Sequence, residues 1–319
     1  MTVADLEKTA SLDRMTGLVL PERRFVQPAS ELERAGREPT TDPEYFEGRQ
    51  GYDPEFLSGW SIGLPLPTEQ ATKDDIRAPR RGGTGPDLKY EHFSVVMSKS
   101  RRMPMLTACN IDGKKSRSLP RITTWSFDGR LNKEDQFGDA LYDDNELDRG
   151  HMVRREDPVW GTVKSAGIAN EDTFHFTNSC PQMAHVNQVI WLGLENYVLN
   201  HTREDDMRVN VFTGPIFTER DLPYRDALVP LAFWKVVAIV TEDGRPSATA
   251  YKIGQKKELS ELEYVFGKYK TFQISIQQVI DETGLGFEPL LKYDGFSEHE
   301  RVSGTRTENL IDTLEKVRV

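Results

Sequence analysis

The sequence predicts an α+β fold whose main layer is a mixed, mainly antiparallel sheet. Segments with strand character outnumber those with helical periodicity, and the two kinds follow one another without regular alternation. An Asp-Gly pair after an apolar run adds a hairpin signal, and hairpins join antiparallel strands. Together these observations indicate an antiparallel sheet that carries a few helices, because a parallel α/β sheet would show regular strand–helix alternation.

Composition divides the chain into three parts. Residues 1–50 are polar, weakly periodic and rich in Glu, Arg and Pro, which predicts an extended or poorly ordered N-terminal arm. Residues 51–295 form the expected globular domain, and its first stretch, 51–67, has the aromatic residues and prolines of a segment that wraps a surface. Residues 296–319 are expected to form a helical C-terminal tail. The length of 319 residues allows a substantial core.

The first half of the domain contains the earliest expected strands. YEHFSVVMS (90–98) follows a Gly-rich turn cluster and has strand composition. MPMLTACNIDGKK (103–115) is the next expected strand and ends in the Asp-Gly turn, with ITTWSFDGRL (122–131) as its hairpin continuation. Alternation from Thr173 to Thr177 predicts a further strand that leaves into a loop containing a proline.

The second half contains one amphipathic helix among strands. The segment 187–203 is predicted to be helical because apolar side chains recur every four residues, at Val186, Ile190, Leu194 and Val198. Asn187 and Glu195 fall on a neighbouring line of the same helix. Later strands are expected at 209–217, 231–240 and 246–253. Residues 271–287 are expected to form a strand or turn and then a short helix that Gly284 ends.

The charge distribution bears on a nucleic-acid partner. The whole chain has a formal charge of −10, which argues against phosphate binding, because such contacts are normally made by a basic surface. The charge is uneven, with −6 over residues 1–72, +3 over 73–165 and −7 over 166–319. The objection is therefore weaker for the middle block, where basic residues cluster at 80–81, 99–102, 114–117 and 154–155.

Composition also excludes several classes of protein. No apolar run reaches the roughly 18 residues that a membrane helix needs, and 37% hydrophobic with 29% charged residues describes a globular chain. Cys109 and Cys180, the only cysteines, are too few for a disulfide framework, although a single bridge stays open. The first residues lack the features of a secretory signal. The chain as written is therefore expected to be cytoplasmic, with export by a specialised route or a removed leader left open.

LDRGHMVRREDP (147–158) places His151 among charged residues, in a stretch too polar for a core element. A neutral imidazole can remove a proton from an attacking water, and an arginine can neutralise charge that builds on phosphorus. Mg²⁺ keeps several waters, so one or two protein oxygens suffice, and Asn187 can supply one. These residues fit a nuclease with one cation and one base. A solvated loop with an incidental histidine, and a thiol hydrolase that uses Cys180, are the alternatives.

Several motifs in order resemble the DNA/RNA non-specific endonuclease family. They are DRGH (148–151), TNSCPQ (177–182), NQVIWLGLE (187–195), VFTGPIF (211–217), PLAFWKVV (230–237) and ETGLGF (282–287). The resemblance covers about residues 85–290. It implies a ββα-metal active-site motif on the larger mixed fold. It also implies cleavage of DNA and RNA to products with a 5′-phosphate, without strong sequence preference.

The resemblance implies a metal site and a base. His151 of DRGH is the expected general base, and Asn187 is the expected direct ligand of Mg²⁺, which Mn²⁺ is expected to replace. Glu195 is expected to hold a metal-bound water, because eight helical residues rise about 12 Å and both side chains would not reach one ion directly. Asn178 is expected to order either the metal shell or the loop beneath it.

The resemblance also implies that two arginines stabilise phosphate. Arg149 comes from DRGH, and Arg121 is the preferred upstream arginine, with Arg130 nearly as good. The expected partners are DNA and RNA, with no membrane, while a homodimer and an inhibitory or activating partner stay open. The rival interpretation is a non-catalytic module that keeps the nuclease fold and binds nucleic acid or protein.

Overall fold

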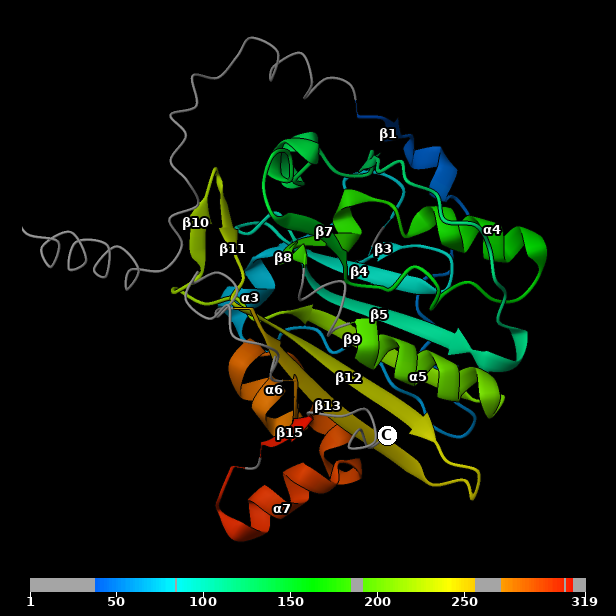
Figure 1. Cartoon of the computed structure of the whole chain (residues 1–319), viewed down its shortest axis with the longest axis vertical. Helices are drawn as coiled ribbons and strands as arrows, with labels where there is room; N and C mark the ends of the chain where they lie inside the picture. Colours follow the sequence, from blue (N-terminus) through cyan, green and yellow to red (C-terminus); the bar gives the residue numbers. More distant parts are fainter. Residues whose placement is uncertain (1–37, 84, 185–191, 256–270, 307, 312–319) are drawn as a thin grey trace, which may run out of the picture.

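The computed structural model describes residues 38–83, 85–184, 192–255, 271–306 and 308–311. Its centre is a nine-stranded sheet whose strands pair antiparallel throughout (Figure 1). Eight of the strands lie in the order β15 (Asn309–Ile311), β14 (Thr271–Ile274), β13 (Pro246–Gly254), β12 (Ala232–Val240), β9 (Arg208–Pro215), β5 (Pro104–Asp112), β4 (Phe93–Ser98) and β2 (Ile76–Arg77), and β3 (Leu88–Lys89) also pairs with β4. The predicted α+β fold with a mainly antiparallel sheet is confirmed.

The central strands are apolar on both faces because both faces are covered. In β12, Phe233 and Val237 belong to one hydrophobic cluster, whereas Trp234 and Val236 belong to another. Successive side chains of a strand point to opposite faces, so the two clusters are the two sides of the sheet. The strands expected at 209–217, 231–240 and 246–253 are present as β9, β12 and β13.

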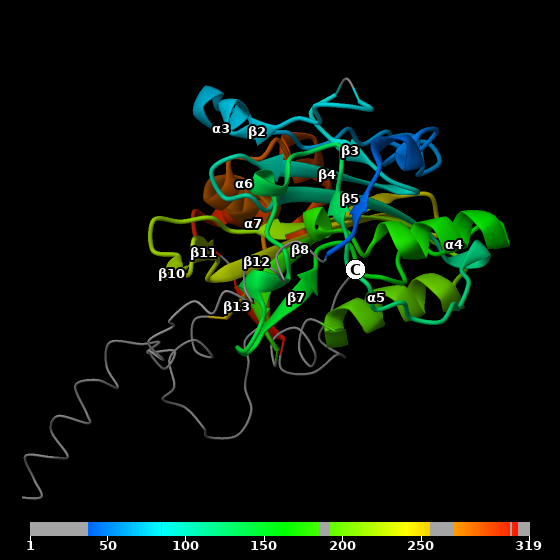
Figure 2. The ribbon, with the colours of Figure 1, turned by 90° about the horizontal axis from the view of Figure 1, so that it is seen from above.

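One face of the sheet carries the elements around His151. Helix α5 (Leu192–Glu204) packs there through Leu194, Val198 and Leu199, and the pair β7 (Leu147–His151) and β8 (Ser179–Met183) lies beside it. Helix α6 (Ile276–Thr283), which ends at the left-handed Gly284 as expected, covers the other face. Figure 2 shows α5 and β7 on one side of the sheet and α6 on the other.

The predicted hairpin after the Asp-Gly turn is wrong. The hairpin is formed by β4 and β5, and after Asp112 the chain enters a short 3-10 helix, η2 (Gly113–Lys115). A Cβ at Gly113 would overlap the carbonyl group of Thr202 on α5, so the glycine permits a close approach between chain segments. β6 (Phe127–Asp128) pairs in parallel with β1 (Thr40–Thr41) instead of continuing a hairpin.

The strand predicted at 173–177 is also wrong. Residues 163–172 form helix α4 (Val163–Asp172), and a 3-10 helix, η5 (Phe176–Asn178), follows it. The strand begins only at β8 and includes Pro181, which a two-stranded edge tolerates. Polar tertiary contacts stabilise the end of α4, because Asp172 is buried and accepts hydrogen bonds from Arg49.

The two ends of the domain differ from the expected boundaries. Residues 38–50 are packed and do not belong to an extended arm, because Phe46 is buried in the core and Arg49 forms an ion pair with Asp172 at 2.8 Å. Residues 1–37 lie outside the described part. The expected helical tail begins as α7 (Gly295–Ser303) and then adds strand β15 to the sheet edge.

The remaining described elements are short. They are α3 (Gln70–Asp74), β10 (Leu222–Tyr224), β11 (Ala227–Val229) and the 3-10 helices η1 (Pro43–Phe46), η3 (Lys133–Asp135), η4 (Asp139–Leu141) and η7 (Glu288–Tyr293). Within the described ranges, no helix is long and apolar enough to cross a membrane.

Candidate active site

The strand pair β7–β8 places His151 at the end of the DRGH sequence. His151 lies opposite Ser179, and Gly150 lies opposite Cys180. A Cβ at Gly150 would overlap the side-chain amide of Gln182, which is completely buried. The glycine is therefore required by the close approach of Gln182, and this packing sets the position of the next residue, His151.

Aromatic rings hold the imidazole of His151. The ring of Trp125 lies 4.6 Å from it between centroids, and the ring of Phe174 meets it edge-on at 5.0 Å. Nε2 of His151 is buried and has no hydrogen-bond partner among the described residues. The orientation of this side chain thus comes from ring packing. Sequence reasoning missed Trp125, which stood in a segment expected to be an ordinary hairpin strand.

Positive charge surrounds this imidazole. Burial, followed by the charges of Arg121, Arg155 and Arg149, lowers the pKa of His151 to about 3. Arg149 pairs with Asp139 and Arg155 with Glu156, whereas no carboxylate in the described ranges forms an ion pair with Arg121. Before substrate binds, His151 is therefore a neutral base beside an excess of guanidinium groups.

The structure separates the two candidate upstream arginines. Arg121 is exposed, and its guanidinium lies 5.6 Å from the centre of the Phe174 ring, which also contacts His151. Arg130 is buried and bonded to Asp128 at 2.6 Å, and it lies over the ring of Phe46. Arg121 is therefore exposed close to His151, whereas the guanidinium of Arg130 is buried in an ion pair.

Asn178 occupies one of the two roles left open by the sequence. Its amide is fully buried, accepts a hydrogen bond from the Val153 backbone N–H at 2.8 Å, and donates to the carbonyls of Val153 and Thr173 at 3.0 Å each. These three bonds fasten the chain just after His151 to the end of α4. Asn178 thus orders the loop beneath the site, and its oxygen faces the backbone of that loop.

The metal-ligand predictions fall partly outside the described ranges. Asn187 lies in 185–191, which the structure does not describe. Glu195 lies on α5, is buried, and places Oε1 3.3 Å from Nζ of Lys235. Arg154, three residues after His151, donates to the Glu195 carbonyl at 3.4 Å and to Asn196 Oδ1 at 2.6 Å. These bonds join the DRGH strand to α5.

The donor set is compatible with a hard cation that keeps most of its waters. Among the described residues, no three His, Cys, Asp or Glu side chains converge on one point. Mg²⁺ does not need such a cluster, because it is commonly bound through one or two protein oxygens. Of the two expected ligands, the described part contains the buried carboxylate of Glu195, and Asn187 lies outside it.

The structure excludes the thiol alternative. Cys109 and Cys180 are free and buried, so they form no bridge, and burial raises the pKa of each thiol well above its ordinary value. A neutral, inaccessible thiol is a poor nucleophile. His92 stacks on Trp160 and His175 bonds the Asp172 carbonyl, so both are packing residues. The side chains of His185 and His201 are not described.

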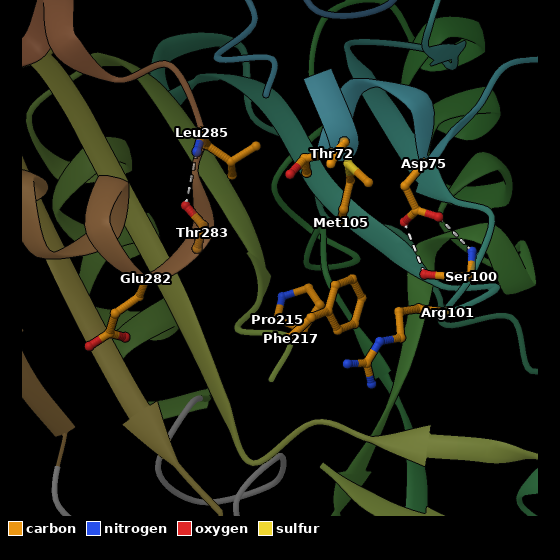
Figure 3. A pocket seen from close by; sticks show the side chains of 11 residues that line it. Thr72, Asp75, Ser100, Arg101, Met105, Pro215, Phe217, Glu282, Thr283 and Leu285 are labelled. Atoms are coloured by element: carbon orange, nitrogen blue, oxygen red, sulfur yellow. Dashed lines mark hydrogen bonds between the residues drawn. The ribbon is translucent and has the colours of Figure 1, made fainter. Parts of the chain in front are cut away.

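A hollow of about 330 Å³ lies elsewhere. Met105, Phe217 and Leu285 line it, and they belong to the cluster on the face of the sheet opposite α5 (Figure 3). Two of its charged groups are engaged elsewhere, because Arg101 pairs with Asp221 at 2.8 Å and Asp75 accepts hydrogen bonds from Ser100, and its apolar lining lies on the face opposite His151. The hollow is therefore separate from the candidate site.

Two antiparallel strands and a following helix, with a partly buried histidine at the end of the first strand and a large antiparallel sheet beneath them, define the ββα-metal class of nuclease folds. The chain belongs to the DNA/RNA non-specific endonuclease family, whose model matches residues 74–294. A chain from the crystal structure of the EndoG/EndoGI complex has the same fold, with a TM-score of 0.51 and 17% identity over 64% of this chain and 86% of that one.

Curated relatives share parts of the sequence. The uncharacterized protein y4fB of Sinorhizobium fredii is 36% identical over 84% of this chain and 43% of its own length. Mitochondrial endonuclease G is 29% identical in Bos taurus, over 47% of this chain and 50% of that protein. The Homo sapiens protein is 32% identical over 35% of this chain and 40% of its own length. The chain therefore spans half or less of the length of these relatives.

Proposed function

We propose that this chain is a Mg²⁺-dependent, sugar-non-specific endonuclease that hydrolyses phosphodiester bonds of DNA and RNA to products with a 5′-phosphate. The observation that carries the proposal is the unprotonated, unpaired imidazole of His151, set among three arginines on the strand pair of a chain from this family. A neutral, partly buried base beside positive charge suits a substrate that is an anion and a reaction that removes a proton from water.

Each residue at the site has a distinct task in this proposal. His151 accepts the proton of the attacking water, and Trp125 and Phe174 keep its ring in place. Arg121 and Arg149 bind the phosphate oxygens and offset the charge that grows on them in the transition state. When bound, Mg²⁺ polarises the phosphate and supports departure of the leaving oxygen. Asn187 and Glu195 would hold the cation, directly and through water.

The proposal also accounts for a lack of sequence preference. Contacts to phosphate fix the position of nucleic acid but carry no information on the bases. Trp125, the aromatic residue nearest His151, is buried and packed against Phe174 and Phe176, so it is not available to stack on a base. DNA and RNA are therefore expected to be cut at many sites.

The test is a digestion of supercoiled plasmid and of total RNA by the purified chain. With Mg²⁺ both substrates should be degraded, EDTA should stop the reaction, and added Mg²⁺ should restore it. Product ends should accept label from polynucleotide kinase only after phosphatase treatment, because they carry a 5′-phosphate. His151→Ala should be inactive, with Cys180→Ala as the matched control that stays active. Cleavage that survives EDTA, or a fixed fragment pattern, would contradict the proposal.

The same digestion, run beside a gel-shift experiment, distinguishes the nuclease from the rival binding module. A non-catalytic descendant would retain nucleic acid in a gel-shift experiment yet leave both substrates intact in the presence of Mg²⁺ and of Mn²⁺. Intact substrate together with tight binding would therefore replace the nuclease proposal with the binding one.

A further inference from the structure

A lysine lies in the middle of the most apolar strand of the sheet. Lys235 of β12 is 1% exposed and shares its face with Phe233 and Val237. Lysine is rarely buried to this degree unless its charge is paired, because transfer of an ammonium group from water is costly. Its Nζ donates to Thr213 Oγ1 at 2.9 Å and lies 3.3 Å from Oε1 of Glu195.

Glu195 is the other half of this buried pair. It is 8% exposed and comes from α5, which crosses the same face of the sheet. Burial raises the pKa of the Glu195 carboxyl, while the charges of Lys235 and Arg154 oppose that rise. The ammonium group of Lys235 thus offsets part of the desolvation cost of the Glu195 carboxylate, which is almost completely buried.

Two residues of the loop after His151 complete a buried ion cluster, which consists of Lys235, Glu195, Arg154 and Asp157. Arg154 lies 3.9 Å from Asp157 and bonds the Glu195 carbonyl. Asp157 is 5% exposed, and burial raises its pKa to about 7. The sheet, α5 and the loop that follows DRGH therefore meet at one charged point beneath the candidate site.

Within this cluster, Lys235 has the backbone with the most strand pairing. β12 pairs with β13 over its full length and with β9 from Phe233 to Ile239, and Lys235 lies opposite Thr213 of β9 and opposite Tyr251 of β13. Glu195 comes from a helix that contacts the sheet by side-chain packing, and Arg154 and Asp157 come from a loop. The position of the ammonium group is thus set by the sheet, and the other three groups are placed relative to it.

We propose that Lys235 is a positioning residue for the nuclease reaction, whose ammonium group holds the Glu195 carboxylate in the place from which it serves the metal site. The proposal rests on the proposed function and gives a role to the lysine of the PLAFWKVV stretch (230–237). Removal of a group that contacts a metal ligand and orients it typically lowers metal affinity or activity by about 10-fold to 100-fold.

The test is a double-mutant cycle of wild type, Lys235→Met, Glu195→Gln and the double variant. Methionine has similar length and no charge, so it removes the ion pair and keeps the volume. We expect Lys235→Met to lower kcat by about 10-fold to 100-fold with little change in KM, and to weaken Mn²⁺ binding in calorimetry by a similar factor. In the Glu195→Gln background the same substitution should change neither quantity, because Lys235 acts through Glu195.

Lys252→Met is the matched control. Lys252 lies on β13, next to β12, and pairs with Glu282 at 2.7 Å. It lies opposite Trp234 and hence on the other face of the sheet. The control removes a lysine–glutamate pair of the same kind from a neighbouring strand without touching α5. It should leave the rate and Mn²⁺ affinity at wild-type levels.

The outcomes divide cleanly. Equal losses from Lys235→Met in both backgrounds would mean a purely structural role and overturn the proposal, as would a Lys235→Met protein with wild-type rate and metal affinity. If Lys235→Met does not fold, the double variant, in which both charges are gone, is compared with Glu195→Gln alone. Equal Mn²⁺ affinity and residual rate then support the proposal, and a further loss refutes it. A wild-type chain that binds Mn²⁺ but cuts neither DNA nor RNA would refute the proposed function. The Mn²⁺ affinities of the four proteins in the cycle would still test whether Lys235 positions Glu195.

Discussion

Replacement of Gly150 by alanine tests how closely strand packing controls His151, the proposed catalytic base. A Cβ at this position would overlap Oε1 and Cδ of Gln182 and would come within 2.6 Å of its Cγ. Carbon atoms pack without strain at about 3.5 Å or more, so the strands β7 and β8 must separate by about 1 Å, or the Gln182 side chain must move. Gln182 is completely buried, so a new position for its side chain requires its packed neighbours to rearrange.

The expected cost follows from this overlap. Overpacking of a filled interior destabilises a protein by about 1–3 kcal/mol, so Gly150→Ala should lower the free energy of unfolding by that amount. The rate should fall further than stability suggests, because His151 is the next residue and a displacement of about 1 Å at a catalytic group can cost about 10²-fold. The double variant Gly150→Ala/Gln182→Ala removes the overlapping atoms and should regain part of the rate.

Urea denaturation and initial rates on plasmid DNA measure the two effects. Gly167→Ala is the control, since nothing lies within 4 Å of a Cβ at this position in α4 and alanine there should stabilise the helix by about 0.5–1 kcal/mol. A Gly150→Ala protein as stable and as fast as wild type would refute the reasoning. So would a double variant no faster than Gly150→Ala alone, because Gln182 would then not be the obstacle.

Three further expectations concern His151, a helix end and phosphate contacts. NMR should find the His151 imidazole neutral from pH 8 to 5, and a bound phosphate analogue should raise its pKa; an ordinary titration near pH 6.5 would contradict the burial. Because the folded chain binds this proton more weakly than the unfolded chain, His151 should reduce stability as pH falls through about 6.5, and His151→Ala should lessen that fall. Gly284 caps α6 at φ 68°, so Gly284→Ala should cost about 1 kcal/mol in urea unfolding, and no loss would argue against the left-handed cap. In the His151→Ala background, Arg121→Ala should reduce the slope of log Kd for DNA against log salt by about 0.9, and an unchanged slope would remove Arg121 from the phosphate site.

The parts of the fold that the sequence predicted are those with a strong local signal. The run containing Phe233, Trp234 and Val236 has strand composition along its whole length, and Gly284 ends a short amphipathic helix. α4 was missed because it has no clear apolar stripe; its end is stabilised by Asp172 through Arg49, which is 123 residues away in the chain. Such a contact leaves no trace in local periodicity.

The same distinction applies to the site. DRGH made His151 and Arg149 candidates together because four adjacent residues carry the motif. The surroundings of His151 come from distant segments, so Trp125 could not be assigned to it in advance, and Arg121 and Arg130 could not be ranked until the ion pair of Arg130 with Asp128 was seen. Lys235 did leave a signal, a single charge within an apolar strand, and such a residue should be taken as a candidate for a buried ion pair.

In the proposed nuclease reaction, the charges around His151 account for how a base with so low a pKa serves near neutral pH. Burial and the guanidinium groups of Arg121, Arg155 and Arg149 disfavour the imidazolium ion, so the imidazole is unprotonated and ready, but it holds a proton weakly. A phosphate that binds to these arginines brings charge of the opposite sign and offsets their effect on the imidazole. The pKa of His151 then rises towards the pH of the reaction, where general-base catalysis is most efficient. The arginines thus do two things: before substrate arrives they keep the base free of protons, and once they bind the phosphate they allow it to accept one.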